Sequence, residues 1–396
     1  MTELYPRKEP KELPAITLAY LGPNGNFTHM AALEYRQTKE NVQLVKVESL
    51  PKIFEMVNQN LINRAIVPID NSSDGHIKDT LQALQGLDIQ IIHELVIPVS
   101  LSLVMRKEAQ PTEVWSKDTA LRQARRFLDK NYPQLKRVEH KSTGDAIWQA
   151  SKNPNIAAIG SRISAREQGI PQDTLTQQDG IEDNPANATR FVVITKDKEL
   201  TPPTENAKTS FIMNVPHQPS KLFLCLSILK SRGINLSQIK SFNEEYGKAS
   251  FIVTISGHQW EENVYQALND LRQQTSLKML GSYKKADYKP PETDEQLSIT
   301  DDDIVNLKRD LFHEKPRETN ETVIAFSLRD RIGALSDVLE IFQRINLTRI
   351  GSSPSTRGKL DEYVFYLGFN NNLPSEKKSQ LMGLLTSQCL QIAILK

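Results

Sequence analysis

The sequence predicts an α/β protein built from a two-lobed N-terminal half and two smaller C-terminal units. Three observations lead to this prediction. Up to about residue 197, short β-type runs alternate with helical patterns, which is typical of a mostly parallel sheet covered by helices. From residue 207 the order becomes β-α-β-β-α-β, the ferredoxin-like arrangement. After a polar stretch, residues 321–396 repeat that order, and an internal repeat indicates a duplicated unit.

Two sets of alternating elements are expected in the N-terminal half. A long apolar stretch at 89–104 crosses from the first set to the second, and a strand at 191–196 returns. Two lobes joined by two crossovers place a cleft between them, where open α/β sheets bind ligands. Strands are expected at 16–21, 42–47, 65–69, 134–140 and 156–159, and helices at 28–36, 50–59, 77–87, 119–128, 143–151 and 161–168.

The C-terminal half begins after a breaker-rich stretch at 199–206. Residues 286–320 are polar and predict a linker with a short helix at 304–312. The segment 344–350, Arg-Ile-Asn-Leu-Thr-Arg-Ile, echoes 233–239, Gly-Ile-Asn-Leu-Ser-Gln-Ile. Strands are expected at 210–215, 235–241, 249–256, 277–283, 322–328, 362–369 and 391–395, and helices at 221–231, 260–275, 334–342 and 375–386.

Composition excludes several functional classes. Lys and Arg number 49 against 48 Asp and Glu, so the chain lacks the basic excess of a nucleic-acid binder. No apolar run reaches the roughly 18 residues that span a bilayer, and the N-terminus has no apolar core of a secretion signal. Cys225 and Cys389 build no disulfide framework, and the histidines lack metal-site spacing. We therefore expect a cytoplasmic protein with no metal, membrane or nucleic-acid partner.

A turn between the first strand and the first helix, Gly-Pro-Asn-Gly-Asn-Phe-Thr at 22–28, is the first candidate binding element. Such a turn presents backbone N–H groups at a helix N-terminus, which suits a carboxylate or phosphate. The candidate contacts are Pro23, Asn26, Phe27 and Thr28, with Thr28 as the expected N-cap. The turn is neither a Walker loop nor a dinucleotide-binding turn. The alternative interpretation is a tight turn with a structural cap.

Two further strand-to-helix turns carry polar side chains. Asp70, Asn71 and Ser72 follow the third strand, and Ser142 and Thr143 open a helix in the second set. Each turn alone is equally typical of a capping loop. Three such helix starts around one cleft favour a small ligand that carries several negative charges.

The fourth motif, Asn-Ala-Thr-Arg-Phe at 187–191, precedes the returning strand. It places a hydroxyl and a guanidinium side by side, between Asn187 and Phe191. Arg190 is a candidate for a bidentate pair with a carboxylate, and Thr189 for a hydrogen bond to a leaving oxygen. The alternative is an ordinary strand entry with a surface arginine.

These four motifs, in this order, resemble the prephenate dehydratase family. The likeness includes Ala-Ala-Ile-Gly-Ser at 157–161 and Gln-Gly-Ile at 168–170, and it covers roughly residues 15–285. It implies a periplasmic-binding-protein-like dehydratase domain with two lobes, followed by a ferredoxin-like ACT domain, and the repeat implies a second ACT domain. The expected domains are the dehydratase at 15–197, the first ACT domain at 207–285, a linker at 286–320 and the second ACT-like domain at 321–396.

The resemblance implies conversion of prephenate to phenylpyruvate, CO2 and water in phenylalanine biosynthesis, with no cofactor because aromatisation drives the reaction. The family's essential threonine corresponds to Thr189, an oriented donor to the departing hydroxide. Arg190 and the helix starts would hold the two carboxylates. Where the family has Ser-His-Pro-Gln, residues 116–119 are Ser-Lys-Asp-Thr. The alternatives are an arogenate dehydratase or non-aromatising prephenate decarboxylase, and a non-catalytic amino-acid sensor.

The same resemblance implies phenylalanine as an effector bound between paired ACT units, and a homo-oligomer formed through them. The family's Gly-Ala-Leu effector motif is kept in the second unit, and Ser-Lys-Leu replaces it in the first. The candidate effector-binding residues are Ser220, Lys221, Leu222, Asn235, Leu236, Gly333, Ala334, Leu335, Asn346 and Leu347.

Overall fold

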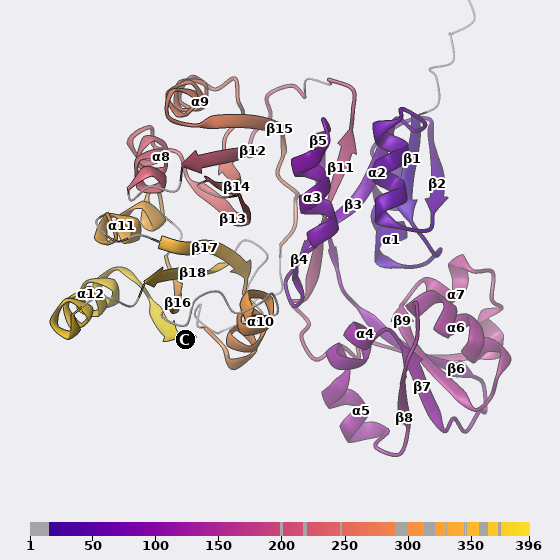
Figure 1. The fold of residues 1–396 in the computed structure, drawn as a ribbon. Helices are drawn as coiled ribbons and strands as arrows, with labels where there is room; N and C mark the ends of the chain where they lie inside the picture. The colour runs from indigo at the N-terminus through magenta and orange to yellow at the C-terminus, as the bar shows by residue number, and fades with distance from the viewer. Residues whose placement is uncertain are drawn as a thin grey trace, which may run out of the picture.

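The computed structural model describes most of the chain from Ile16 to Lys396 (Figure 1). Within these described parts, no helix is both long and apolar enough to cross a membrane. The described residues are 16–198, 201–216, 220–245, 248–289, 299–312, 321–329, 331–343, 345, 347–355, 363–370 and 374–396.

The first lobe is a six-stranded sheet with helices on both faces. Its elements are β1 (Ile16–Leu21), α1 (Phe27–Gln37), β2 (Val42–Val47), α2 (Leu50–Asn58), β3 (Arg64–Asn71), β4 (Gly75–His76), α3 (Lys78–Gly86), β5 (Gln90–Pro98) and β11 (Ala188–Thr195). Strands β2, β1 and β3 are parallel, but β11 runs antiparallel to β3 and β5, so the expected mostly parallel sheet is mixed. Alternate side chains face opposite sides, so Leu18 packs with α1 and Ala19 with α2 and α3.

The second lobe is a five-stranded sheet reached through the predicted apolar crossover. Its elements are β6 (Leu101–Arg106), β7 (Glu113–Ser116), α4 (Asp118–Gln123), α5 (Arg125–Asn131), β8 (Lys136–Glu139), α6 (Thr143–Lys152), β9 (Ile156–Ser161), α7 (Ser164–Glu167), the short 3-10 helix η1 (Gln172–Thr174) and β10 (Leu175–Asp179). The expected helix at 119–128 is broken at Ala124 into α4 and α5. Strands β7 and β10 were not predicted, because both runs are short and β10 is mainly polar.

The C-terminal half forms one eight-stranded sheet from the two predicted units. Its elements are β12 (Ala207–Pro216), α8 (Lys221–Ser231), β13 (Leu236–Glu245), β14 (Lys248–Ser256), α9 (Glu262–Gln274), β15 (Ser276–Lys284), α10 (Asp301–Phe312), β16 (Glu321–Ser327), α11 (Ala334–Ile341), β17 (Leu347–Pro354), β18 (Tyr363–Asn370), α12 (Ser375–Gln388) and β19 (Gln391–Ile394). The strand order is β15-β12-β14-β13-β17-β18-β16-β19, joined where Lys240 of β13 pairs with Gly351 of β17. Figure 1 shows α9, α8, α11 and α12 following one another along this sheet.

The two C-terminal units are not separate globules, because they share one apolar core. Phe211 of the first unit and Phe326 of the second are both fully buried in it. The other face of the first unit packs on the first lobe, where Ile212 joins the cluster that contains Ile91. Helix α10, predicted within the linker, places Leu307 against the second unit. The C-terminal half is thus built directly onto one lobe of the N-terminal half.

Candidate active site

A cleft of about 660 Å³ lies between the two lobes. Its walls come from the carboxyl ends of β1, β2 and β3 and the start of β11 in the first lobe, and from the starts of α4 and α6 in the second. Most of the side chains singled out in the four sequence motifs line this cleft. They are Pro23, Asn26, Phe27, Thr28, Asn71, Ser142, Thr143, Thr189 and Phe191.

The turn at 22–28 forms part of both the cleft wall and the contact between lobes. Asn26, not the expected Thr28, caps α1, because its Oδ1 accepts a hydrogen bond of 2.8 Å from the His29 N–H. Asn26 Nδ2 also donates to the Leu21 carbonyl at 2.9 Å. A Cβ on Gly25 would lie 2.5 Å from the Ser164 Cα of the second lobe. Only glycine therefore allows this turn to approach the second lobe so closely.

Thr189 and Asn71 meet on the cleft wall at the ends of two paired strands. Asn71 Nδ2 donates to Thr189 Oγ1 at 2.8 Å, while Asn71 Oδ1 accepts from the backbone N–H groups of Ser73 and Asp74. These two accepted bonds fix which end of the Asn71 amide is the donor. Because a threonine hydroxyl has one proton, accepting a bond from Asn71 leaves that proton to be donated elsewhere. The pair thus presents an oriented O–H donor at the cleft.

Ser72 and Asn187 lie behind this wall and not on it. Both are buried, and neither is among the residues that line the cleft. Ser72 Oγ donates to Asn187 Oδ1 at 3.0 Å and accepts from the Ala188 N–H at 3.0 Å. The expectation that they contact the ligand directly is wrong in this geometry. They fasten the end of β3 to the start of β11 instead.

Arg190 and Asp70 point away from the cleft, which corrects the expectation that both bind substrate. Arg190 is 3 % exposed; its Nε lies 3.4 Å from Asp70 Oδ1 and its Nη1 3.4 Å from Glu94 Oε2. The reason is strand geometry, because successive side chains face opposite sides and Thr189 takes the cleft side. Lys208 of the first C-terminal unit completes this buried cluster, with its Nζ 3.0 Å from Glu94 Oε1.

The two carboxyl groups of the buried cluster have pKa values that are shifted in opposite directions. Burial raises the pKa of Asp70, and the nearby Arg190 only partly offsets that effect. Burial also opposes ionisation of Glu94, but Lys208 and Arg190 outweigh it and lower the pKa of Glu94. Of the two carboxyl groups, Glu94 is therefore the one whose ionised form the two cations favour.

Three lysines that the sequence analysis did not single out supply positive charge to the cleft. They are Lys46 from the first lobe and Lys117 and Lys141 from the second. Each lies at or just beyond the carboxyl end of a parallel strand, namely β2, β7 or β8. That position is where a ligand meets an α/β sheet, so it was a usable sequence signal.

The second-lobe helix start at Ser142 is built as expected. Ser142 Oγ accepts from the Asp145 N–H at 3.0 Å and caps α6. Asp145 in turn lies 3.5 Å from Lys141 Nζ and 2.5 Å from His140 Nε2. The hydrogen bond from His140 is the main cause of the lowered pKa of Asp145.

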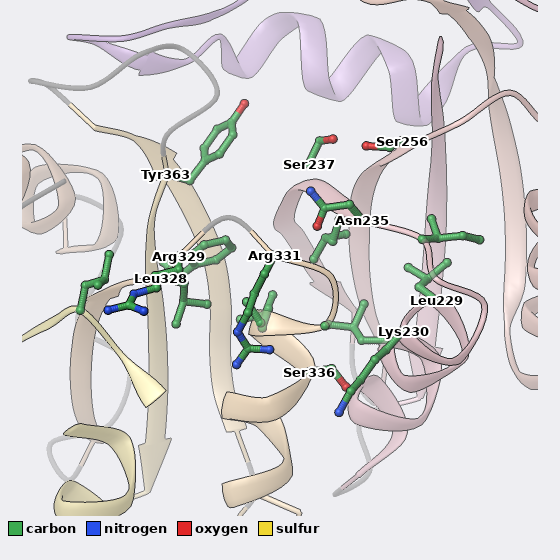
Figure 2. A pocket seen from close by; sticks show the side chains of 18 of the residues that line it. Leu229, Lys230, Asn235, Ser237, Ser256, Leu328, Arg329, Arg331, Ser336 and Tyr363 are labelled. Carbon is green, nitrogen blue, oxygen red and sulfur yellow. The ribbon is translucent and has the colours of Figure 1, made fainter. Parts of the chain in front are cut away.

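A second pocket, of about 370 Å³, lies where the two C-terminal units meet, and we call it the junction pocket (Figure 2). Of the candidate effector residues, five line it and four described ones do not, while Asn346 lies outside the described residues. Those in the lining are Asn235, Leu236, Gly333, Ala334 and Leu335. Those outside it are Ser220, Lys221, Leu222 and Leu347.

The junction pocket combines an apolar floor with charged side chains at its edge. Figure 2 shows Asn235 and Ser237 of the first unit opposite Tyr363 of the second, with Arg331 between the units. Arg331 and Lys230 each contact Asp337 at 2.6 Å. Burial opposes ionisation of Asp337, but hydrogen bonds from these two cations outweigh it and lower its pKa. The apolar lining is Leu226, Leu229, Ile234, Leu236, Leu328, Ala334, Leu335, Phe365 and Leu390.

The fold and cleft define a two-lobed α/β protein with a lysine-lined cleft between its lobes and a paired ferredoxin-like region. A model of the prephenate dehydratase family matches residues 18–199. Over 276 residues, the chain is 33 % identical to the bifunctional chorismate mutase/prephenate dehydratase of Aquifex aeolicus. The aligned region covers 68 % of this chain and 74 % of that relative. The chain therefore belongs to the prephenate dehydratase family.

Solved structures agree with this fold. The crystal structure of prephenate dehydratase from Arthrobacter aurescens in complex with L-Phe matches with a TM-score of 0.63 at 29 % identity, over 70 % of this chain and 92 % of that one. The structure of GqqA, a quorum quenching acylase, matches with a TM-score of 0.61 at 21 % identity, over 68 % of this chain and 98 % of that one. At that lower identity the likeness shows the fold alone, so the argument for an activity rests on the cleft residues.

Proposed function

We propose that this chain is a carbon–oxygen lyase that converts prephenate to phenylpyruvate, CO2 and water. The observation that carries the proposal is the 2.8 Å hydrogen bond from Asn71 to Thr189 on the cleft wall. It leaves the threonine proton free to reach a ligand in the cleft. Membership of the prephenate dehydratase family supports the choice of substrate.

The elimination needs an oriented donor more than a strong acid. As the ring carboxylate leaves as CO2, its bonding pair enters the ring and the C–O bond breaks, and the departing hydroxide takes up one proton from solvent to become water. Thr189 donates to the departing oxygen, which lowers the cost of its developing charge. Asn71 holds the threonine oxygen, so little reorganisation is needed as the bond breaks. No oxidant or electron acceptor is consumed.

We assign the two substrate carboxylates to the cleft lysines, because Arg190 faces the other way. Lys46 approaches from one lobe, and Lys117 and Lys141 approach from the other, beside the capped start of α6. The Lys117→Ala enzyme is expected to raise KM about tenfold with little change in kcat, the pattern of lost ground-state binding. Lys107→Ala, an exposed lysine of the same lobe that is not in the lining, is the matched control. An unchanged KM for Lys117→Ala would remove this assignment.

Arogenate is the second candidate substrate, because Glu48 also lines the cleft. Arogenate carries an ammonium group where prephenate carries a ketone, and a carboxylate can pair with it. Steady-state rates with both substrates, followed by ultraviolet absorbance and product mass, decide between them. Phenylpyruvate from prephenate is the expected result. Phenylalanine from arogenate alone favours the second candidate, loss of CO2 without aromatisation indicates a decarboxylase, and no product from either leaves an amino-acid sensor.

We further propose that residues 207–285 and 321–396 are ACT domains and that the junction pocket binds L-Phe. The A. aurescens relative is a complex with L-Phe. The apolar floor suits a phenyl ring, and Arg329 and Arg331 suit its carboxylate. Isothermal titration of the full chain should give one site, weakened by Arg329→Ala but not by Arg272→Ala on α9. An unaltered affinity in Arg329→Ala would contradict the placement.

Assembly and location are proposals of the same kind. We propose a homo-oligomer formed through the C-terminal sheet, whose outermost strands in the described chain are β15 and β19. We also propose a cytoplasmic location, which fits two free cysteines in a reducing compartment. Light scattering of the purified chain tests the first proposal, and fractionation of the source cells tests the second.

A further inference from the structure

Strand β13 connects the junction pocket to the catalytic lobe within a few residues. Asn235, Leu236 and Ser237 line the pocket, and the next residue, Gln238, is 6 % exposed and faces the first lobe. Its Nε2 donates to Asp70 Oδ2 at 3.2 Å and lies 3.4 Å from His76 Nδ1. One wall of the proposed effector site is therefore continuous with a polar contact at the end of β3.

The state of His76 follows from its other ring nitrogen. His76 Nε2 lies 2.8 Å from the Ser352 carbonyl of β17, and a carbonyl only accepts, so Nε2 carries a proton. Burial lowers the pKa of His76 well below its usual value, so the ring is neutral and Nδ1 is an acceptor. The two hydrogens of the Gln238 amide thus go to Asp70 and His76. Strands β13 and β17, one from each C-terminal unit, thus hold the β3–β4 turn through hydrogen bonds.

The same turn holds the catalytic side chains. Asp70 pairs across the sheet with Arg190, and Asn71 pairs with Thr189. Asp70 and Arg190 face the C-terminal half, whereas Asn71 and Thr189 face the cleft. Because neighbouring residues on one strand move together, a displacement of Asp70 shifts the Asn71 amide that holds the Thr189 hydroxyl.

We propose that Gln238 is a positioning residue for Thr189, and that it transmits occupancy of the junction pocket to the cleft through Asp70 and His76. This inference rests on the proposed dehydratase function and its effector site. It assigns the coupling to a side chain that touches neither ligand. Gln238 acts by holding the end of β3 in the register that the catalytic pair requires.

Reciprocal binding tests this directly. Titrations measure the L-Phe affinity with and without saturating phenylpyruvate, the product, and the phenylpyruvate affinity with and without L-Phe. In the wild-type chain the two ratios should be equal and about fivefold or more, because coupling is reciprocal. In Gln238→Met both ratios should fall below about twofold, with the L-Phe affinity alone retained. Gln274→Leu, on the exposed face of α9, is the control that keeps the wild-type ratios.

Separate measurement of kcat and KM, together with backbone hydrogen exchange, completes the test. Gln238→Met should lower kcat with KM for prephenate little changed, and backbone hydrogen exchange at 188–191 should accelerate even without ligands. If Gln238→Met does not fold, His76→Gln, which removes the acceptor on the other side, should reduce the ratios in the same direction. Unchanged ratios, kcat and exchange in a folded variant overturn the proposal. A wild-type chain that neither turns over prephenate nor binds L-Phe overturns the proposed function instead, and the exchange result then decides the positioning role alone.

Discussion

The two C-terminal units follow one β-α-β-β-α-β pattern, yet their matching helix starts are used differently. Helices α8 and α11 lie antiparallel, so the start of each meets the end of the other. At one meeting point Gly333 packs on Lys230 beside the junction pocket. At the other, the Ser220 hydroxyl donates to the Gln343 carbonyl at 2.5 Å. The first contact forms part of the wall of the junction pocket. The second joins the start of α8 to the residues that follow α11.

The units also differ in how they meet the catalytic lobe. The first inserts Lys208 and Gln238 into the buried cluster behind Thr189. The second meets the same lobe at the Ser352 carbonyl, which accepts from His76. Contact with the first lobe requires polar groups at fixed strand positions. The junction pocket requires a glycine at a helix start. The duplication lets each unit meet one of these requirements.

The largest expected effect concerns the core that the units share. Phe211→Ala and Phe326→Ala each remove a fully buried ring and should lower the free energy of unfolding by about 3–5 kcal/mol. Because both rings lie in one cluster, each variant should shift a single transition common to both units. Urea unfolding followed by circular dichroism checks this. Two separate transitions, with only one displaced in each variant, would show that the units are independent.

The difference in how the two units contact the first lobe should appear when one buried lysine and one partly buried arginine are each replaced by methionine. Lys208→Met leaves Glu94 buried with one cation fewer and should cost about 3–5 kcal/mol of stability and lower kcat. Arg349→Met breaks the partly buried pair with Glu321 inside the second unit, at 2.8 Å, and should cost less. Because that pair lies away from the cleft, kcat should stay within about twofold. Equal losses of kcat in both variants would remove the distinction between the units.

The helix starts provide the next comparison. Gly333 has φ +77°, and a Cβ there would lie 2.6 Å from Lys230 Cγ. Gly333→Ala should therefore weaken L-Phe binding about tenfold, a change of about 1.4 kcal/mol. Ser220→Ala should leave the affinity unchanged. Titration calorimetry of both variants is the measurement, and the reverse ranking would place the effector at the other helix junction.

The smallest effect is a dependence on pH at the contact between His76 and Ser352. Burial, Lys240 and Arg190 all lower the pKa of His76 in the folded chain. The stability from the neutral ring is therefore fully present above its unfolded pKa of about 6.5 and is lost as pH falls below it. The difference in unfolding free energy between the wild type and His76→Gln should shrink between pH 7 and pH 5. A difference that grows on acidification would mean that the ring is protonated in the folded chain.

Much of the architecture was predictable because hydrophobic period and breakers mark the elements. The two lobes, the crossover at 89–104 and both β-α-β-β-α-β units are confirmed. The antiparallel β11 was not foreseen, because its sequence carries no mark of strand direction. The break at Ala124 lies inside a continuous helical pattern, so propensity alone did not indicate it.

The sequence predicted many of the residues that form the site, but not the side of the strand to which each side chain points. The Thr189–Arg190 pair was recognised, yet the sequence alone did not show which of the two neighbours faces the cleft. Only the buried partners of Arg190, which come from distant parts of the chain, settle that question. Gln238 escaped notice for a similar reason, because a lone glutamine on a strand carries no motif. The cleft lysines lie at strand ends, a position that favours ligand contact, but the motif containing Arg190 offered a more specific cation for a carboxylate.

The most direct test of the account is prephenate turnover by Thr189→Val and Thr189→Ser, with Thr176→Val on β10 as the control. Valine keeps the shape of threonine without a donor, whereas serine keeps the hydroxyl. We predict that Thr189→Val lowers kcat about 100-fold or more with KM little changed, and that Thr189→Ser retains most of the rate. Phenylpyruvate formed by Thr189→Val at the wild-type rate would contradict the central claim that this hydroxyl assists the departing oxygen.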